Sequence, residues 1–168
     1  MVPKIIHQIW IGEEPEMIVE ARKTVKELNP DFTYMFWDES NTAEFFTKKD
    51  EENSTHIAHL CNVIKVNIIS KYGGIYIDAD VICLVPLEEW FCKYKNKRLS
   101  SYFIQDTYPE TGVIIAEPKI NFYLALVDYI PNAPMVFYWQ RMKPSCIPES
   151  EVGKNGTILK DLRLNSWT

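Results

Sequence analysis

The sequence predicts an α/β fold with a mostly parallel central sheet flanked by helices, and three observations support this prediction. Stretches typical of strands alternate along the chain with stretches that have helical spacing. A helical stretch runs directly into Gly73 and Gly74, and an apolar, strand-like run follows at once. The chain has 168 residues, enough for one core but few for two, so we expect residues 1–168 to form a single compact domain.

The first part of the chain has the pattern of a strand, a helix and a second strand. The predicted elements are a strand at 3–11 closed by Gly12, a helix at 13–28, and a strand at 32–37 that ends at Asp38. Acidic residues occupy the first turn of the predicted helix, which suits the helix dipole. The Asn-Pro-Asp sequence at 29–31 makes a turn between the helix and the second strand.

The middle of the chain predicts a short helix and loop at 39–52 and then a longer helix. This helix begins near Ser54 or Thr55, either of which could cap it, and ends at Tyr72. Its apolar residues fall on several faces, so we expect it to be largely buried. Further on, the sequence predicts strands at 101–105 and 112–116, a helix at 118–129, and a loop-rich segment at 131–148.

Two carboxylates, Asp78 and Asp80, interrupt the apolar run IYIDADVICLV, which we interpret as a single strand at 75–85. Residues i and i+2 of a strand face the same side, so the two side chains would project together and Ala79 would face away. An unpaired buried carboxylate costs several kcal/mol, so a divalent cation such as Mg²⁺ or Mn²⁺, bridging to a diphosphate, would explain the pair. The alternative is a strand that ends at Asp78, with both carboxylates in a solvated turn.

Composition excludes several classes of function. The net charge of −5 argues against a nucleic-acid partner, because such proteins present a basic surface. No apolar run reaches the roughly 18 to 20 residues of a membrane span, so we expect no integral membrane segment. The N-terminus lacks the pattern of a signal peptide, and the four cysteines show no zinc-binding spacing. These features favour a cytoplasmic location with free thiols.

The predicted topology also indicates where a ligand would bind. In α/β sheets, ligands lie at the carboxyl ends of the strands, where the strand order reverses. The residues that follow the first two predicted strands, Trp10, Gly12 and Asp38, would share this edge with Asp78 and Asp80. We therefore expect one binding site at this edge.

Two motifs give the chain a resemblance to a known family. The sequence YGGIYIDADV is similar to the signature of the DXD glycosyltransferases of the sugar-binding-region type, and VPKIIHQIWIG is similar to the family's opening strand. The family includes capsular-polysaccharide transferases, Och-type mannosyltransferases and the catalytic domain of the large clostridial glucosylating toxins. The resemblance implies a GT-A-like (Rossmann-like) fold, a nucleotide-sugar donor, Mn²⁺ or Mg²⁺ as cofactor, and retention of anomeric configuration. We expect UDP-glucose or UDP-galactose as donor and a saccharide or glycoconjugate as acceptor, in a reaction such as polysaccharide biosynthesis.

The resemblance also implies roles for individual residues. Trp10 matches the tryptophan that lies on the nucleotide base, and Ile9 and Ala79 would line the nucleotide site beside it. Asp78 matches the carboxylate on the ribose or sugar side, and Asp80 matches the direct metal ligand, so this pair carries the catalytic function. His7 and Gln8 match the family as well, but we interpret His7 as structural.

The C-terminal sequence LNSWT is similar to a Ser-Trp element of the family. The resemblance implies that Ser166 and Trp167 reach the metal and the phosphate oxygens. Family members often carry a histidine a few residues earlier, where this chain has Asp161, and an aspartate is also a competent metal ligand.

The chain departs from the family on the helix before the glycine pair. Where members carry Ser-Asp-x-x-Arg, this chain has Asn62 in place of the aspartate and Lys65 in place of the arginine. Lysine offers a cation to a phosphate but not a bidentate fork, and asparagine supplies no charge. The alternative is therefore a catalytically weakened relative that binds a nucleotide sugar in a regulatory or assembly role. A phosphotransferase with a D-x-D nucleophile ranks far behind both.

Overall fold

The structure is a computed structural model that describes residues 1–54, 56–104, 108–119 and 144–161. Its larger sheet has six strands in the order β2-β1-β3-β6-β5-β7, and a smaller one has the order β4-β9-β8. The helices are α1 (Glu16–Leu28), α2 (Lys48–Asn53), α3 (Ile57–Tyr72) and α4 (Glu88–Tyr94), with a 3-10 turn at Ala43–Phe45. The strands are β1 (Ile5–Ile9), β2 (Thr33–Trp37), β3 (Gly74–Ile77), β4 (Val81–Cys83), β5 (Leu99–Ile104), β6 (Tyr108–Ala116), β7 (Ser145–Ile147), β8 (Val152–Gly153) and β9 (Leu159–Asp161).

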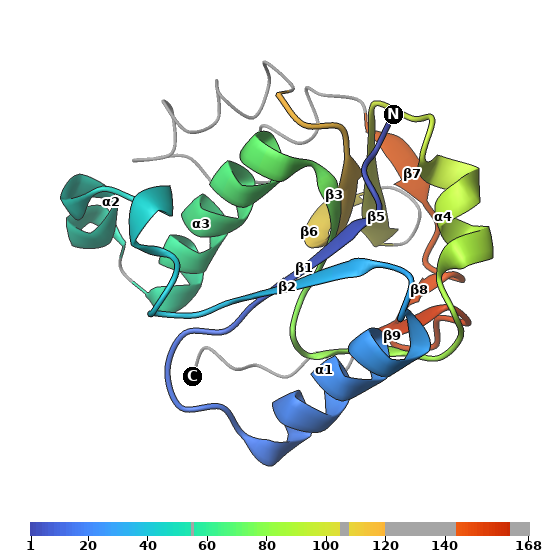
Figure 1. The fold of residues 1–168 in the computed structure, drawn as a ribbon, viewed down its shortest axis with the longest axis horizontal. Coiled ribbons are helices and arrows are strands. Elements are labelled where there is room, and N and C mark those ends of the chain that lie inside the picture. The colour runs from blue at the N-terminus through green and yellow to red at the C-terminus, as the bar shows by residue number, and fades with distance from the viewer. Residues whose placement is uncertain (55, 105–107, 120–143, 162–168) are drawn as a thin grey trace.

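The larger sheet confirms the predicted α/β class. Strands β2, β1 and β3 run parallel, β6 is antiparallel to β3 and to β5, and β7 is parallel to β5. Helix α3 lies on one side of this sheet and α1 on the other (Figure 1). Two buried clusters result: Val63, Ile64 and Ile68 of α3 belong to one, and Val25 of α1 belongs to the other.

The sequence patterns explain both helices. Helix α1 buries Ile18, Ala21 and Val25, which are spaced three and four residues apart and so form one stripe. Helix α3 is buried on several faces, as predicted, because it is covered by the sheet and by the segment around Phe45. It begins at Ile57 and not at a Ser54 cap, because Ser54 instead ends α2 and bonds back to the Asp50 carbonyl.

The prediction of one strand across residues 75–85 is wrong. Strand β3 ends at Ile77, a turn contains Ala79 and Asp80, and β4 pairs with β9 in the smaller sheet. All four residues of β3 are buried, and the chain leaves the sheet at Asp78, which is partly exposed. The two apolar halves of the run therefore pair in different sheets, although Ile75, Ile77, Val81 and Cys83 pack in the same buried cluster. The turn interpretation is correct for the position of the carboxylates.

Some elements were not foreseen, and some predictions fall outside the described residues. Helix α4, which buries Trp90, Phe91 and Tyr94, follows β4, and the short strands β7, β8 and β9 come late in the chain. The predicted helix at 118–129 and loop at 131–148 lie largely outside the described residues. Within the part of the chain that is described, no helix is long and apolar enough to cross a membrane.

A glycine pair joins α3 to β3 without a loop. Gly73 and Gly74 have positive φ angles of 65° and 107°, a conformation that side-chain-bearing residues rarely adopt. The carbonyl of Gly73 lies 2.8 Å from the Nε2 atom of His7 in β1. The corner therefore holds α3, β3 and β1 together.

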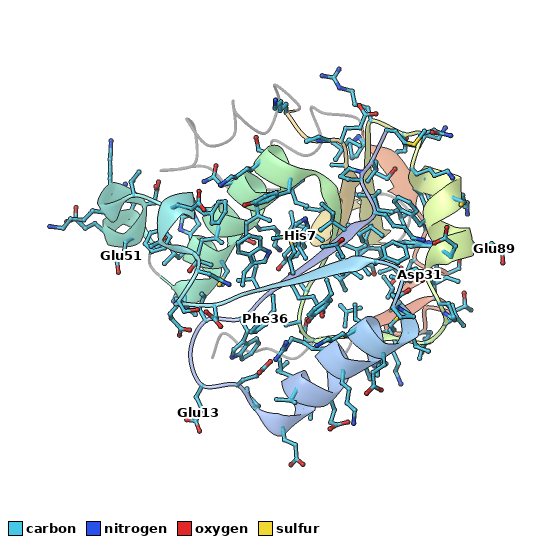
Figure 2. The ribbon with its side chains drawn as sticks, viewed as in Figure 1. His7, Glu13, Asp31, Phe36, Glu51 and Glu89 are labelled. Atoms are coloured by element: carbon cyan, nitrogen blue, oxygen red, sulfur yellow. The ribbon has the colours of Figure 1, made fainter. Side chains whose placement is uncertain are left out.

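His7 is fully buried, and its ring lies in the interior, while Glu13, Glu51 and Glu89 lie at the periphery (Figure 2). The indole N–H of Trp37 donates to Nδ1 over 3.1 Å, so Nε2 carries the proton and donates to Gly73. Burial lowers the pKa of His7 to about 4, although its bond to Gly73 acts in the opposite direction. The ring is neutral, and both of its nitrogens are hydrogen-bonded inside the protein, which confirms the interpretation of His7 as structural.

We expect the protein to lose stability as the pH falls from 7 to 5. The unfolded chain binds a proton at His7 near pH 6.5, whereas the folded protein resists protonation down to about pH 4. The free energy of unfolding should fall by about 2 kcal/mol over this range, measured by urea denaturation.

In the His7→Gln variant, this decrease in the free energy of unfolding should disappear. His56 is exposed, so the His56→Gln variant serves as a control and should keep the decrease. An equal decrease in His7→Gln and in the wild type would contradict the assignment.

Candidate functional site

A cavity of about 240 Å³ lies where β1 and β3 end, facing the first half of α3. Seven of the residues predicted from the sequence line it: Ile9, Trp10, Asn62, Lys65, Asp78, Ala79 and Asp80. The parallel pairing of β2, β1 and β3 confirms that their C-terminal ends share one edge. Asp38 follows β2 at this edge, but its carboxylate accepts bonds from Ser40, and it is not among the described residues that line the cavity.

Trp10 lies on the wall of this cavity, directly after β1. Its backbone N–H donates to the Trp37 carbonyl over 3.0 Å, which extends the pairing of β1 with β2 by one residue. Its indole N–H donates to the Glu13 carbonyl over 3.0 Å, which orients the ring. An indole held at both its backbone and its ring nitrogen offers a flat apolar surface to a ligand.

Asp78 is the first carboxylate of the turn, and its side chain is 37% exposed. Its Oδ1 atom accepts hydrogen bonds from the Lys65 ammonium at 3.0 Å and the Tyr76 hydroxyl at 2.8 Å. Burial, and then the negative charge of Asp78, raise the pKa of Tyr76 well above its usual value, so the hydroxyl keeps its proton and donates. Asp78 is thus held from inside while part of its side chain stays accessible.

Lys65 is buried, with only 3% of the residue exposed. Besides Asp78, its ammonium donates to the carbonyl of Thr111 at 3.1 Å and to the hydroxyl of Thr111 at 3.4 Å, and it lies 4.4 Å from the centre of the Tyr76 ring. An ammonium has three N–H donors, and these three acceptors can take all of them. In this structure Lys65 therefore neutralises and orients Asp78.

Asp80 lines the same cavity, and the topology brings a third aspartate close along the backbone. Residue Val81, which follows Asp80, pairs with Asp161 in the smaller sheet. Among the side chains that the structure describes, no three His, Cys, Asp or Glu residues gather as a metal cluster. The predicted contacts of Ser166 and Trp167 lie outside the described residues.

The carboxylates of Asp78 and Asp80 fit a divalent cation. Oxygen donors suit Mg²⁺ or Mn²⁺, and a site with only two protein carboxylates leaves coordination positions for the oxygens of a phosphorylated ligand. The Lys65 cation offsets the negative charge of Asp78, which lowers the repulsion between the two carboxylates of the cavity wall.

Sequence reasoning missed five described residues of the cavity wall: Ile11, Ile57, Ala58, Cys61 and Tyr76. Tyr76 precedes Asp78 by two residues, and Ala58 and Cys61 lie on the same face of α3 as Asn62 and Lys65. Helical spacing alone could have identified Ala58 and Cys61. Burial raises the pKa of the Cys61 thiol to about 11, so Cys61 is a protonated wall residue at neutral pH and not a nucleophile.

The chain matches a family model over a segment that includes α3 and the Asp78–Asp80 turn. Residues 15–97 match the model of a family described as the glycosyltransferase sugar-binding region containing a DXD motif. Over 89 residues the chain is 36% identical to inositol phosphoceramide mannosyltransferase 3 of Schizosaccharomyces pombe, a match that covers 49% of this chain. The matched region spans 25% of the length of that relative.

Two solved structures share the fold. One is the PaToxG glycosyltransferase, with a TM-score of 0.54 and 15% identity over 84% of this chain and 63% of that one. The other is a glycosyltransferase involved in glycosylation of the major capsid of PBCV-1, with a TM-score of 0.50 and 14% identity over 95% of this chain and 93% of that one. Both likenesses confirm the GT-A type of α/β fold.

We expect Asp78 and Lys65 to be energetically coupled. Asp78→Asn would leave the Lys65 cation buried without its counter-charge and should lower the free energy of unfolding by about 1–3 kcal/mol. Lys65→Met should also destabilise the protein, but the double variant should lose about 1 kcal/mol less than the sum of the two single losses. Urea denaturation of all four proteins measures this coupling, and strictly additive losses would contradict the ion pair.

Proposed function

We propose that the chain, whose residues 15–97 match the glycosyltransferase sugar-binding region containing a DXD motif, transfers a hexose from a nucleotide sugar to a hydroxyl group. The donor we propose is UDP-glucose or UDP-galactose, and the acceptor is a saccharide or glycoconjugate. The observation that carries the proposal is one cavity that contains Trp10, Asp78 and Asp80 together. We further propose that residues 1–168 act as a single domain, and the four free cysteines support a cytoplasmic location.

Each side chain of the cavity has a distinct part in the proposed reaction. The Trp10 ring would stack on the base, an interaction worth about 1–3 kcal/mol. Asp78, held by Lys65 and Tyr76, would accept a hydrogen bond from a ribose or sugar hydroxyl. Asp80 and Asp78 would hold Mn²⁺ or Mg²⁺, with Asp161 as a further proposed ligand, and such an ion stabilises the negative charge of a departing diphosphate. Asn62, one helical turn from Lys65, would bond a sugar hydroxyl through its neutral amide.

The relatives favour a second candidate donor. Inositol phosphoceramide mannosyltransferase 3 is named for transfer of mannose, which GDP-mannose would supply. The base would then be guanine, which also has a flat face for Trp10 to stack on. Comparing UDP with GDP therefore distinguishes the two donors.

A binding role without turnover is the second candidate function. The buried Lys65 already uses its donors within the protein, and Asn62 carries no charge, so both residues would contact the donor more weakly than an arginine and an aspartate. The protein would then bind the nucleotide sugar in a regulatory or assembly role. This candidate predicts nucleotide binding without release of sugar.

Isothermal titration calorimetry with UDP and with GDP, each with and without Mn²⁺, tests the proposed site. We expect tight binding of one nucleotide that requires Mn²⁺ and that Asp80→Asn abolishes. Asp38→Asn is a matched control, because it removes a carboxylate at the same sheet edge but outside the described cavity wall. Trp10→Leu should weaken binding by about 5- to 100-fold through the lost stacking. Binding that is independent of the metal, or no binding, would contradict the proposal.

A turnover assay separates the enzyme from the binding module. We expect slow release of free hexose from UDP-glucose, UDP-galactose or GDP-mannose in the presence of Mn²⁺, because water can replace the acceptor. Asn62→Asp should tighten donor binding, since a carboxylate accepts stronger hydrogen bonds from sugar hydroxyls than an amide does. Metal-dependent nucleotide binding with no release of sugar would instead support the regulatory role.

A further inference from the structure

A line of hydrogen bonds crosses the protein from helix α1 to the Asp78–Asp80 turn. The guanidinium of Arg22 in α1 donates from Nη1 to the Tyr34 hydroxyl of β2 at 3.4 Å. That hydroxyl donates to the side-chain oxygen of Gln8 in β1 at 2.9 Å, and the Gln8 amide nitrogen donates to the backbone carbonyl of Asp78 at 3.2 Å. Arg22 lies on α1, which Figure 1 shows on the opposite side of the sheet from α3.

The chemistry of the groups gives this line a single direction. A guanidinium has donors but no acceptor, so the Tyr34 oxygen accepts from Arg22 and its own proton is free to point toward Gln8. Gln8 must then present its oxygen to Tyr34, and this orientation turns its NH₂ group toward Asp78. The Asp78 carbonyl, which can only accept, requires the same orientation, so Arg22 and Tyr34 reinforce the orientation of the Gln8 amide from the other end.

Both ends of the line are fixed. Arg22 forms an ion pair with Glu14 through two nitrogens, one of them 2.7 Å from the carboxylate, and its guanidinium carbon lies 3.6 Å from the centre of the Phe36 ring. Gln8 is completely buried, so water does not compete for its amide. A buried amide bonded at both its oxygen and its nitrogen has one stable orientation.

The bond from Gln8 acts on the backbone that places the carboxylates. The Asp78 carbonyl also accepts the Val81 N–H at 3.1 Å, which closes the turn around Ala79 and Asp80, and the Asp78 N–H donates to the Gly112 carbonyl at 2.8 Å. With Gln8 added, the peptide groups on both sides of Asp78 are held from neighbouring strands. A shift of the Asp78 carbonyl would move the whole turn.

We propose that Gln8 is a positioning residue for the Asp78–Asp80 turn, and that Arg22 and Tyr34 hold its amide in the orientation that donates to Asp78. The consequence for ligand binding rests on the proposed function, whereas the consequence for the turn itself does not. Loss of the line should loosen the turn and weaken metal-dependent nucleotide binding, while stacking on Trp10 stays intact.

Hydrogen–deuterium exchange of the ligand-free protein tests the effect on the turn. Tyr34→Phe removes the hydroxyl but keeps the ring, and it should speed exchange in a peptide covering residues 78–83 by about 5- to 10-fold. Tyr94→Phe is the matched control, because it removes a hydroxyl that bonds to Glu151 and takes no part in this line. It should leave exchange of the Val81 N–H, which closes the turn, unchanged. Equal exchange of the peptide in both variants would overturn the proposal.

Two further variants keep the test decisive if Tyr34→Phe folds poorly. Gln8→Glu replaces the donor NH₂ by an acceptor facing the Asp78 carbonyl, so it should speed exchange in the peptide more than Tyr34→Phe does. Arg22→Met leaves both inner groups in place and should have a smaller effect in the same peptide. If Arg22→Met speeds exchange in the peptide more than Gln8→Glu does, the direction assigned to the line of hydrogen bonds is wrong.

Calorimetry with UDP and GDP then connects the turn to the ligand. We expect Tyr34→Phe to weaken Mn²⁺-dependent binding of the preferred nucleotide by about 3- to 10-fold, with no such loss in Tyr94→Phe. Faster exchange without weaker binding would show that the turn moves but does not serve the nucleotide, which overturns this second part. If the wild-type protein binds no nucleotide, the proposed function fails, while the exchange experiment still decides the role of Gln8.

Discussion

The site depends on the close approach of helix α3, strand β3 and strand β1 at Gly73 and Gly74. A Cβ atom on Gly73 would lie 2.6 Å from Pro118 Cδ, and one on Gly74 would lie 2.7 Å from the Ile5 carbonyl oxygen. Because no side chain fits, α3 passes directly into β3 and the two elements stay in fixed register. Lys65, two turns before the corner, therefore meets Asp78, which lies just after β3. His7 reinforces this geometry from β1, so one glycine pair and one neutral histidine place the ion pair on the wall of the cavity.

The ion pair also sets the charge of the cavity. The aspartate and arginine that family members carry, together with the two carboxylates of the DXD motif, would give a formal charge of −3 + 1 = −2. Asn62, Lys65, Asp78 and Asp80 give −2 + 1 = −1. A less negative cavity repels a diphosphate less, but it also attracts a divalent cation less strongly. In the proposed site, the departures at Asn62 and Lys65 would thus change the balance between metal binding and nucleotide binding more than they would remove either.

The features predicted from the sequence are those that depend on local patterns. Helical spacing located α1 and α3, and the strand pattern before Trp10 and Asp78 placed both at one sheet edge. The split of the apolar run at Asp78 could not be predicted, because hydrophobicity reports burial and not which sheet buries a residue. The partners of Lys65 and Gln8 are 13 and 70 residues away in the chain, so only the tertiary structure brings them together. Helix α4 was not predicted, because it is short and its apolar residues follow closely on the preceding apolar run in the sequence.

The two interpretations of the Asp78–Asp80 pair, a metal site within a strand and a solvated turn, need not exclude each other. A carboxylate in the middle of a buried strand would be shielded from a large ligand such as a nucleotide diphosphate. A carboxylate in a turn at the end of a buried strand has its backbone fixed by neighbouring strands and its side chain open to the cavity. Asp78 meets both conditions, since its backbone is bonded to Gln8 and Gly112 while its side chain is 37% exposed. The turn is therefore the arrangement that best allows the same carboxylates to be both rigid and accessible.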